Sequence, residues 1–315
     1  MKLTFLGTSA AAPTRSRNTT AVALQLDQRS DWWLFDCGEG TQHQVMRSSF
    51  TLPRLSRIFV SHLHGDHCFG LPGLLATRGL QSGQTPVDLY GPAALSEYLN
   101  GVRRATGTHF QFPVTINEVR SGEIAYEDDE VSIRAVAVQH GGPTFAWILD
   151  EKPQAGRFRI EEAQKLNIPP GPVYAKLKAG ETVTLADGRT IDGKSLVDPP
   201  RTGRKLALVF DTCDASALAP FAQNADLLLH EATFLQSDNQ QAKEYGHSTG
   251  ADAARFAAAI NAKRLVLSHF SSRYEQYDPA MPSVANILAE AQALLPGREV
   301  IAAKDFLTIE IQRPQ

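Results

Sequence analysis

Apolar and polar residues alternate at the start of the chain, and this pattern predicts strands before the first helix. Residues 2–6 and 19–26 have the two-residue period of a half-buried strand, and the apolar run 32–36 adds a third strand. A helix is predicted from about Thr41 to Arg47. Because strand follows strand, the first third of the chain is predicted to form an antiparallel meander.

Strands and helices alternate along most of the remaining chain. Helices are predicted over 71–80, 92–104 and 249–260, and Ser248 is predicted to cap the last of them. Strands are predicted over 57–61, 87–90, 114–119, 131–139, 144–149, 206–210, 227–229, 265–267, 299–302 and 306–311. This order predicts one α/β domain over residues 1–315.

Residues 151–200 break the rhythm of strands and helices. The segment is rich in Pro and Gly, as in Pro169-Pro170-Gly171-Pro172, and is predicted to be an inserted arm with little core of its own. Residues 151–205 hold 11 Lys or Arg against 7 Asp or Glu, so the insertion is basic. The whole chain has a net charge of −3, which leaves −7 for the remainder.

The composition is that of an ordinary globular protein, with 43% hydrophobic and 21% charged residues. Three widely spaced cysteines form neither a disulfide framework nor a Cys-type zinc motif, which indicates a reducing, cytoplasmic environment. No apolar run approaches the roughly 18 residues of a membrane span, so no membrane association is expected.

The strongest chemical pattern is His62-Leu63-His64-Gly65-Asp66-His67, directly after the predicted strand Arg57–Ser61. His and Asp are ligands that zinc prefers, and manganese is an alternative at such a site. On an extended segment His62 and His64 project to the same side, whereas Asp66 and His67 come after a turn that the glycine permits. The spacing therefore predicts two metal ions.

Three later strands also end in a metal-binding type of residue: His140, Asp211 and His269. Each alone has an ordinary explanation, as a loop histidine, a helix-capping aspartate or a packed core histidine. Their recurrence at strand ends, beside the motif, favours the metal role. We predict that one cation is held by His62, His64 and His140, the other by Asp66, His67 and His269, and that Asp211 bridges them.

Glu231 and His247 form a second pair that metal binding does not require. A histidine oriented by a carboxylate is a suitable proton donor, because the negative charge raises its pKa. The ordinary alternative for His247 is a capping role ahead of Ser248-Thr249. We predict catalytic roles for Glu231 and His247, together with Asp66.

These features resemble the metallo-β-lactamase superfamily and, within it, the short form of the ribonuclease Z family of tRNA 3′-processing endonucleases. Further segments that resemble this family are Phe5-Leu6-Gly7-Thr8 with 13–18, Asp36-Cys37-Gly38-Glu39-Gly40-Thr41, His230-Glu231-Ala232-Thr233-Phe234, and Gly171-Pro172 with Lys176-Leu177-Lys178. The pattern departs from the family at Arg15, where a Lys is usual, and at Ala175, where a Gly is expected.

The resemblance implies a four-layer αβ/βα fold of two facing sheets with helices outside. It also implies a homodimer in which the arm of one subunit clamps tRNA for the active site of the other. Basic groups on such an arm can bind phosphates, although the chain as a whole is acidic. The predicted substrate-binding residues are Arg15, Arg17, Asn18, Arg157, Arg159, Lys176 and Lys178.

The predicted reaction is hydrolysis that removes the 3′ trailer of precursor tRNA, leaving a 3′-hydroxyl on the tRNA and a 5′-phosphate on the trailer. Asp66 would orient the attacking water or take its proton, and His247 would protonate the leaving 3′-oxygen. One alternative is a hydrolase of the same superfamily that acts on a small phosphodiester or ester. Another is a non-catalytic RNA-binding protein with structural metals.

Overall fold

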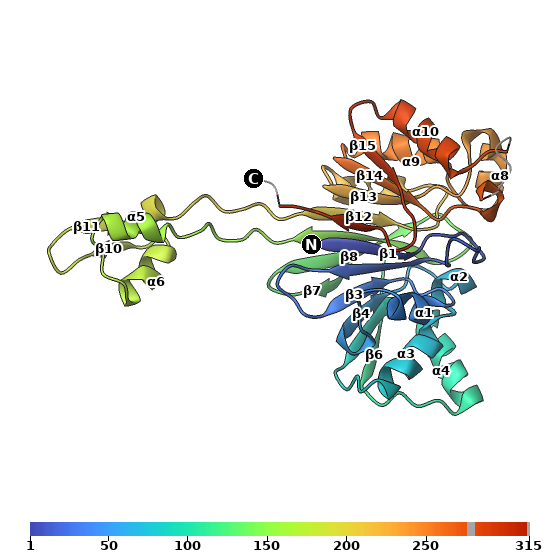
Figure 1. Cartoon of the computed structure of the whole chain (residues 1–315), viewed down its shortest axis with the longest axis horizontal. Helices are drawn as coiled ribbons and strands as arrows, with labels where there is room; N and C mark the ends of the chain where they lie inside the picture. Colours follow the sequence, from blue (N-terminus) through green and yellow to red (C-terminus); the bar gives the residue numbers. More distant parts are fainter. Residues whose placement is uncertain (276–280, 314–315) are drawn as a thin grey trace. The chain divides into compact units, whose positions relative to one another are not determined.

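The computed structural model describes residues 1–275 and 281–313, and two seven-stranded sheets form the framework of this described part (Figure 1). Across the first sheet the order is β16 (Thr308–Glu310), β1 (Lys2–Gly7), β2 (Ala21–Gln25), β3 (Trp32–Phe35), β4 (Leu55–Phe59), β5 (Val87–Gly91) and β6 (Val114–Glu118). Across the second it is β15 (Glu299–Ala302), β14 (Arg264–Ser268), β13 (Leu227–Glu231), β12 (Lys205–Val209), β9 (Thr144–Glu151), β8 (Val131–Val138) and β7 (Ile124–Glu127).

Strand direction changes within each sheet. β1, β2 and β3 pair antiparallel as the predicted meander, and β3 to β6 then pair in parallel. In the second sheet β12 to β15 are parallel. Parallel neighbours need crossover connections, which helices supply. Outside residues 151–204, the described α-helices are α1 (Thr41–Met46), α2 (Gly65–Cys68), α3 (Leu71–Leu80), α4 (Ala94–Thr106), α7 (Ala219–Ala222), α8 (Asn239–Glu244), α9 (Gly250–Ala259) and α10 (Val284–Leu294).

Three hydrophobic clusters separate four layers. Trp33 and Phe59 of the first sheet pack with Trp147 and Leu208 of the second to form the central core. A second cluster joins the outer face of the first sheet to α3 and α4, and a third joins the outer face of the second sheet to α9 and α10. Figure 1 shows these helices on the two outer faces. The predicted αβ/βα fold is therefore confirmed.

The observed helix limits agree with one prediction from the sequence and differ from another. The predicted helix over 71–80 is α3. The predicted cap Ser248 is wrong, because Thr249 is the N-cap of α9 and forms a capping box with Asp252. Ser248 Oγ instead donates to the carbonyl of Thr212 at 2.6 Å. Helix α10 was not predicted. In the described part of the chain, no helix combines the length and the apolar character that crossing a membrane needs.

The chain divides into two compact units, Met1–Asp150 with Lys205–Gln312, and Glu151–Arg204 with Arg313. The second unit, which we call the arm, holds α5 (Ile160–Lys165), α6 (Pro172–Lys178), β10 (Thr182–Thr184) and β11 (Thr190–Asp192). The sequence predicted little core for this segment, and the core that it forms is small. Side chains from successive segments of the arm meet in a small core of Phe158, Ala163, Ile168, Leu177 and Leu196.

The two chain segments at the root of the arm are tied together by Glu151 and Arg204. The Glu151 carboxylate accepts from Arg204 Nε at 2.8 Å and from Arg204 Nη2 at 2.6 Å, and also from Arg313 Nη2 at 2.8 Å. A Cβ on Gly203 would lie 1.6 Å from the carbonyl oxygen of Glu151, so only glycine permits this close approach. The root is therefore a paired and ordered segment.

Candidate metal centre

The ends of four strands bring the predicted metal-binding residues together at one edge of the two sheets. Strand ends are rigid mounts, and the carboxyl ends of parallel strands are where α/β proteins usually place their ligands. The seven residues are His62 and His64 after β4, Asp66 and His67 in α2, His140 after β8, Asp211 after β12 and His269 after β14.

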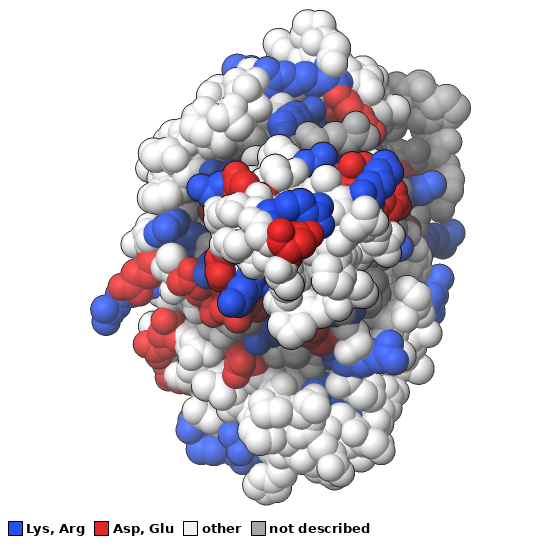
Figure 2. All heavy atoms as spheres, turned by 90° about the vertical axis from the view of Figure 1, so that its left-hand side faces the viewer, with Lys and Arg blue, Asp and Glu red and all other residues white. Residues whose placement is uncertain are grey.

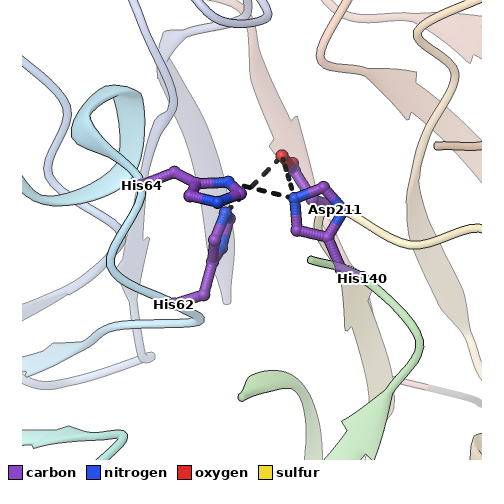
Figure 3. A group of neighbouring side chains, drawn as sticks. All are labelled: His62, His64, His140 and Asp211. Carbon is purple, nitrogen blue, oxygen red and sulfur yellow. Dashed lines mark hydrogen bonds and ion pairs between the residues drawn. The ribbon is translucent and has the colours of Figure 1, made fainter. Parts of the chain in front are cut away.

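The seven side chains form two groups that share Asp211. Within each group the candidate ligand atoms lie within 4.8 Å of one another, and the groups are His62, His64, His140 and Asp211 (Figure 3), and Asp66, His67, His269 and Asp211. This is the partition predicted from the sequence.

The Asp211 carboxylate turns one oxygen to each group. Asp211 Oδ2 lies 3.7 Å from His62 Nε2 and 3.6 Å from His140 Nε2. Asp211 Oδ1 lies 3.1 Å from both His67 Nε2 and His269 Nε2. Two ligands of one tetrahedral zinc ion stand about 3.3 Å apart, so these spacings suit ligands that converge on a cation.

Buried atoms without hydrogen-bond partners give an independent test of whether cations fit. His62 Nε2, His67 Nε2, His269 Nε2 and Asp211 Oδ1 are buried and have no hydrogen bond. Buried polar atoms are rarely left in this state, because the lost hydration is costly. All four point into the two groups, so the donor set fits two divalent cations.

Hydrogen bonds at Nδ1 leave the Nε2 lone pair of several histidines directed inward. His67 Nδ1 donates to Asp36 at 2.7 Å, and His140 Nδ1 donates to the carbonyl of Gly246 at 2.8 Å. His269 Nδ1 lies 2.8 Å from Thr20 Oγ1. His64 is arranged differently, because its Nδ1 faces His140 Nε2 at 3.1 Å. A neutral imidazole whose other nitrogen is so engaged is the form that binds metal.

The electrostatics of the centre also favour cations. Burial raises the pKa of Asp211, but His269 and His67 outweigh it and hold that pKa well below its ordinary value. Burial lowers the pKa of His67, whereas the carboxylates of Asp211, Asp36 and Asp66 raise it well above its ordinary value. Carboxylates that stabilise a proton on His67 would equally stabilise a cation, which would displace that proton.

Asp36 is a functional residue whose role the sequence did not reveal. It is fully buried after β3 and accepts from Ser61 N at 2.7 Å, Ser61 Oγ at 2.8 Å and His67 Nδ1. Ser61 Oγ in turn lies 2.9 Å from His62 Nδ1, so one carboxylate orients a histidine in each group. Its position directly after a strand was the available signal.

Three residues around the centre have a strained backbone. Asp36, His269 and Ala11 have φ values of 57°, 59° and 61°, in the left-handed region that non-glycine residues rarely adopt. The Ala11 amide donates to Asp66 Oδ2 at 2.8 Å, so the strained loop holds one of the acidic side chains in place.

Gly65 leaves room for a neighbouring side chain, which is a different role from the predicted tight turn. Its φ is not positive, and it begins α2 immediately after His64. A Cβ at Gly65 would lie 2.4 Å from the ring of Phe69. The glycine therefore allows an aromatic ring to pack against the backbone between the two pairs of metal-site residues.

His247 and Glu231 lie beside the two groups. His247 Nδ1 donates to Glu231 Oε1 at 2.9 Å, and the His247 ring is centred 5.0 Å from His140 and 5.5 Å from His269. Burial lowers the pKa of His247, but the Glu231 carboxylate outweighs it and raises this pKa to about 9. Glu231 is itself fixed by the amides of Thr212 and Thr233 at 2.9 and 3.1 Å.

The predicted substrate-binding residues of the first loop have different surroundings. Arg15 is exposed. Arg17 Nη1 donates to Thr8 Oγ1 and to the carbonyl of Ala303, both at 2.7 Å, and its Nε pairs with Glu275. Asn18 Nδ2 donates to the Glu39 carbonyl at 2.9 Å. Arg17 and Asn18 thus hold the loop in place. In the arm, exposed side chains include Arg157, Arg159, Lys176 and Lys178.

Curated relatives named ribonuclease Z match this chain over almost its whole length. Ribonuclease Z of Synechococcus sp. (strain WH7803) is 51% identical over 316 residues, which cover 99% of this chain and 96% of the relative. Ribonuclease Z of Nostoc sp. (strain PCC 7120) is 47% identical over 313 residues, with 99% and 96% covered. A family model described as "Anti-Pycsar protein Apyc1" matches residues 1–140.

Solved structures agree with these sequence matches. The crystal structure of human tRNase Z, short form (ELAC1), superposes with a TM-score of 0.71 at 30% identity and covers 99% of this chain and 100% of that one. The metallo-β-lactamase fold protein YhfI from Bacillus subtilis has a TM-score of 0.68 at 18% identity, with 98% of each chain covered, and shows the shared fold.

Proposed function

This chain belongs to the ribonuclease Z family, and on that premise we propose that its two His/Asp groups hold two divalent cations with which it removes the 3′ trailers of tRNA precursors. It is a metal-dependent endoribonuclease that hydrolyses phosphodiester bonds. The observation that supports the two-cation site best is the shared carboxylate of Asp211, whose two oxygens face different groups. Zinc suits the donor set, and manganese is the alternative.

The residues around the two groups have distinct roles in this proposal. Bound cations would supply an activated water near neutral pH and offset the negative charge that develops on the phosphoryl oxygens. Asp66, held by the Ala11 amide, would orient the water or take its proton. His247, kept protonated by Glu231, would donate a proton to the leaving 3′-oxygen of the tRNA. The phosphate then stays on the trailer.

We propose that the arm binds the tRNA through its exposed basic side chains. Arg157, Lys178 and Arg201 line one hollow of the arm beside the rings of Phe158 and Tyr174. On the face drawn in Figure 2, Lys and Arg are interspersed with Asp and Glu instead of forming a single patch. Separate basic groups can meet successive phosphates of an RNA backbone.

The proposal includes a cytoplasmic homodimer in which the arm of one subunit presents tRNA to the other. Light scattering in line with gel filtration measures the molar mass in solution. A dimer should have twice the chain mass of 34.4 kDa. A monomeric mass for an active enzyme would contradict this part of the proposal.

The decisive experiment maps the ends produced from a precursor tRNA by zinc-loaded protein, with and without a chelator. We expect a tRNA with a 3′-hydroxyl and a trailer with a 5′-phosphate, and no cleavage with chelator. His247→Ala should lose most cleavage but keep tRNA binding. Cleavage that survives the chelator would contradict the metal-dependent mechanism.

A further inference from the structure

A cavity of about 490 Å³ opens directly beside the first metal-binding group. His62 and His64 form part of its wall, whereas His247 and Asp66 do not line it. The volume lies within the range of about 300–1,000 Å³ that small-ligand pockets occupy. The cavity is therefore continuous with the proposed reaction centre and large enough for one more chemical group.

Apart from the two histidines, the lining of the cavity is mostly apolar. Phe145 and Val119 are buried, with 8% and 9% of their surfaces exposed, and Pro92 and Pro143 add two further ring surfaces. Among the described residues that line the cavity there is no Lys, Arg, Asp or Glu. Such a surface favours a flat neutral ring over a phosphate, because nothing offsets the cost of dehydrating a charge.

The proposed proton donor indicates which part of the substrate can reach this cavity. His247 lies beside His140 and His269, so the leaving 3′-oxygen and the tRNA attached to it belong on that side. The phosphate remains joined to the first trailer nucleotide through its 5′-oxygen. The nucleoside of this first trailer nucleotide can therefore extend past His62 and His64. We propose that the cavity binds the base of the first trailer nucleotide.

This inference rests on the proposed function, because it assigns a subsite to the same reaction. Base rings stack on apolar and aromatic surfaces regardless of sequence, so the subsite would favour the presence of a base without selecting its identity. Ala93 and Ala94, both exposed at the start of α4, leave the rim of the cavity open. A larger side chain at Ala94 would fill the cavity.

Calorimetric titration of the zinc-loaded protein with uridine 5′-monophosphate and with ribose 5-phosphate tests the subsite without relying on cleavage. The two ligands share the sugar and the phosphate and differ in the base. We expect the nucleotide to bind at least about ten-fold more tightly. Equal affinities would overturn the proposal.

Ala94→Trp should abolish this difference in affinity. Ala105→Trp is the matched control, because Ala105 is exposed on the same helix about 16 Å farther along and should leave the difference unchanged. Circular dichroism and thermal melting establish that both variants are folded. A folded Ala94→Trp protein that keeps the full preference for the nucleotide would overturn the assignment to this cavity.

A kinetic comparison separates this inference from the proposed function. Two precursor tRNAs are used, one natural and one that lacks the base at the first trailer position. The precursor without this base should be cleaved with a kcat/KM at least about ten-fold lower. If neither precursor is cut but the nucleotide preference remains, the proposed tRNA processing fails and the subsite stands. If both are cut equally and the two ligands bind equally, the subsite fails and tRNA processing stands.

Discussion

Asp36 touches none of the reacting groups, yet it determines which nitrogen of His67 faces Asp211. As an acceptor from His67 Nδ1 at 2.7 Å, it keeps the proton there and leaves the Nε2 lone pair inside the centre. Asp36→Asn would place an amide donor against Nδ1 and shift the proton to Nε2. We expect a 10- to 100-fold loss of zinc affinity. Zinc content after dialysis at a series of free zinc concentrations measures it.

Glu39→Gln is the control for that experiment, since Glu39 is an exposed carboxylate of the same segment. It should retain the zinc affinity of the unmodified protein. Unchanged zinc binding by a folded Asp36→Asn protein would show that Asp36 does not position His67.

Glu231 governs the protonation of His247 in the same way that Asp36 governs His67. A proton donor is active below its pKa, so cleavage should fall as pH rises through the pKa of His247, which Glu231 raises to about 9. Glu231→Gln removes the negative charge and should move this alkaline decline to lower pH by about 1–3 units. The pH dependence of kcat/KM for precursor tRNA measures the shift.

Glu244→Gln, at an exposed position on α8, is the matched control and should leave the pH profile unchanged. An alkaline limb that stays in place in Glu231→Gln would mean that His247 is not the group whose proton the reaction needs.

Single residues could be predicted from the sequence where chemistry and local pattern coincide. His62 to His67 are contiguous, and His140, Asp211 and His269 each follow an apolar strand. The position of Asp36 after a strand was a signal, but the hydrogen-bond partners of Asp36 and Thr20 could not be predicted, because these bonds join segments far apart in the chain. Nothing in the local sequence fixes such a pairing.

Among the connecting elements, the loop over residues 13–18 combines two different uses of arginine. Arg17 is bonded to Thr8, Ala303 and Glu275, whereas Arg15 is exposed. Arg17→Ala should lower the free energy of unfolding by about 1–3 kcal/mol, because it removes two hydrogen bonds and one ion pair that hold this loop. Arg15→Ala should keep that stability and raise KM for precursor tRNA. Urea denaturation and steady-state kinetics measure the two effects.

The opposite pattern, with stability lost in Arg15→Ala and retained in Arg17→Ala, would contradict these assignments. The two variants can be compared directly, because each removes one arginine side chain from the same loop.

At the level of elements, the sequence predicted types better than boundaries. The helix over 71–80 was predicted with its observed limits, but the cap of α9 was placed one residue early because Ser248 and Thr249 are both good capping residues. The residues that form the small arm core were not predicted, because they are scattered among Pro and Gly and show no period. Local pattern carries no information on contacts of that kind.

For the molecule as a whole, the arm is inserted between two strands that are already neighbours. β9 and β12 pair antiparallel, with Asp150 opposite Lys205. Replacing residues 152–200 by a short Gly/Ser linker should therefore preserve the two-sheet framework. We expect kcat/KM for precursor tRNA to fall at least about ten-fold through lost phosphate contacts, while hydrolysis of bis(p-nitrophenyl) phosphate continues.

The salt dependence of cleavage provides the internal control for the deletion. Fewer phosphate contacts should reduce the decline of kcat/KM for precursor tRNA with rising salt. A shortened protein that still melts cooperatively and cleaves precursor tRNA at the original rate would exclude the arm from substrate binding.

The sharing of Asp211 has one consequence for how the centre fills. Its carboxylate is a rigid planar group, so an ion that binds Oδ1 also sets the direction in which Oδ2 points. Occupancy of one half is thereby linked to occupancy of the other, and the linkage is reciprocal. A titration with cations should therefore not fit two independent sites, because the first ion changes the affinity for the second.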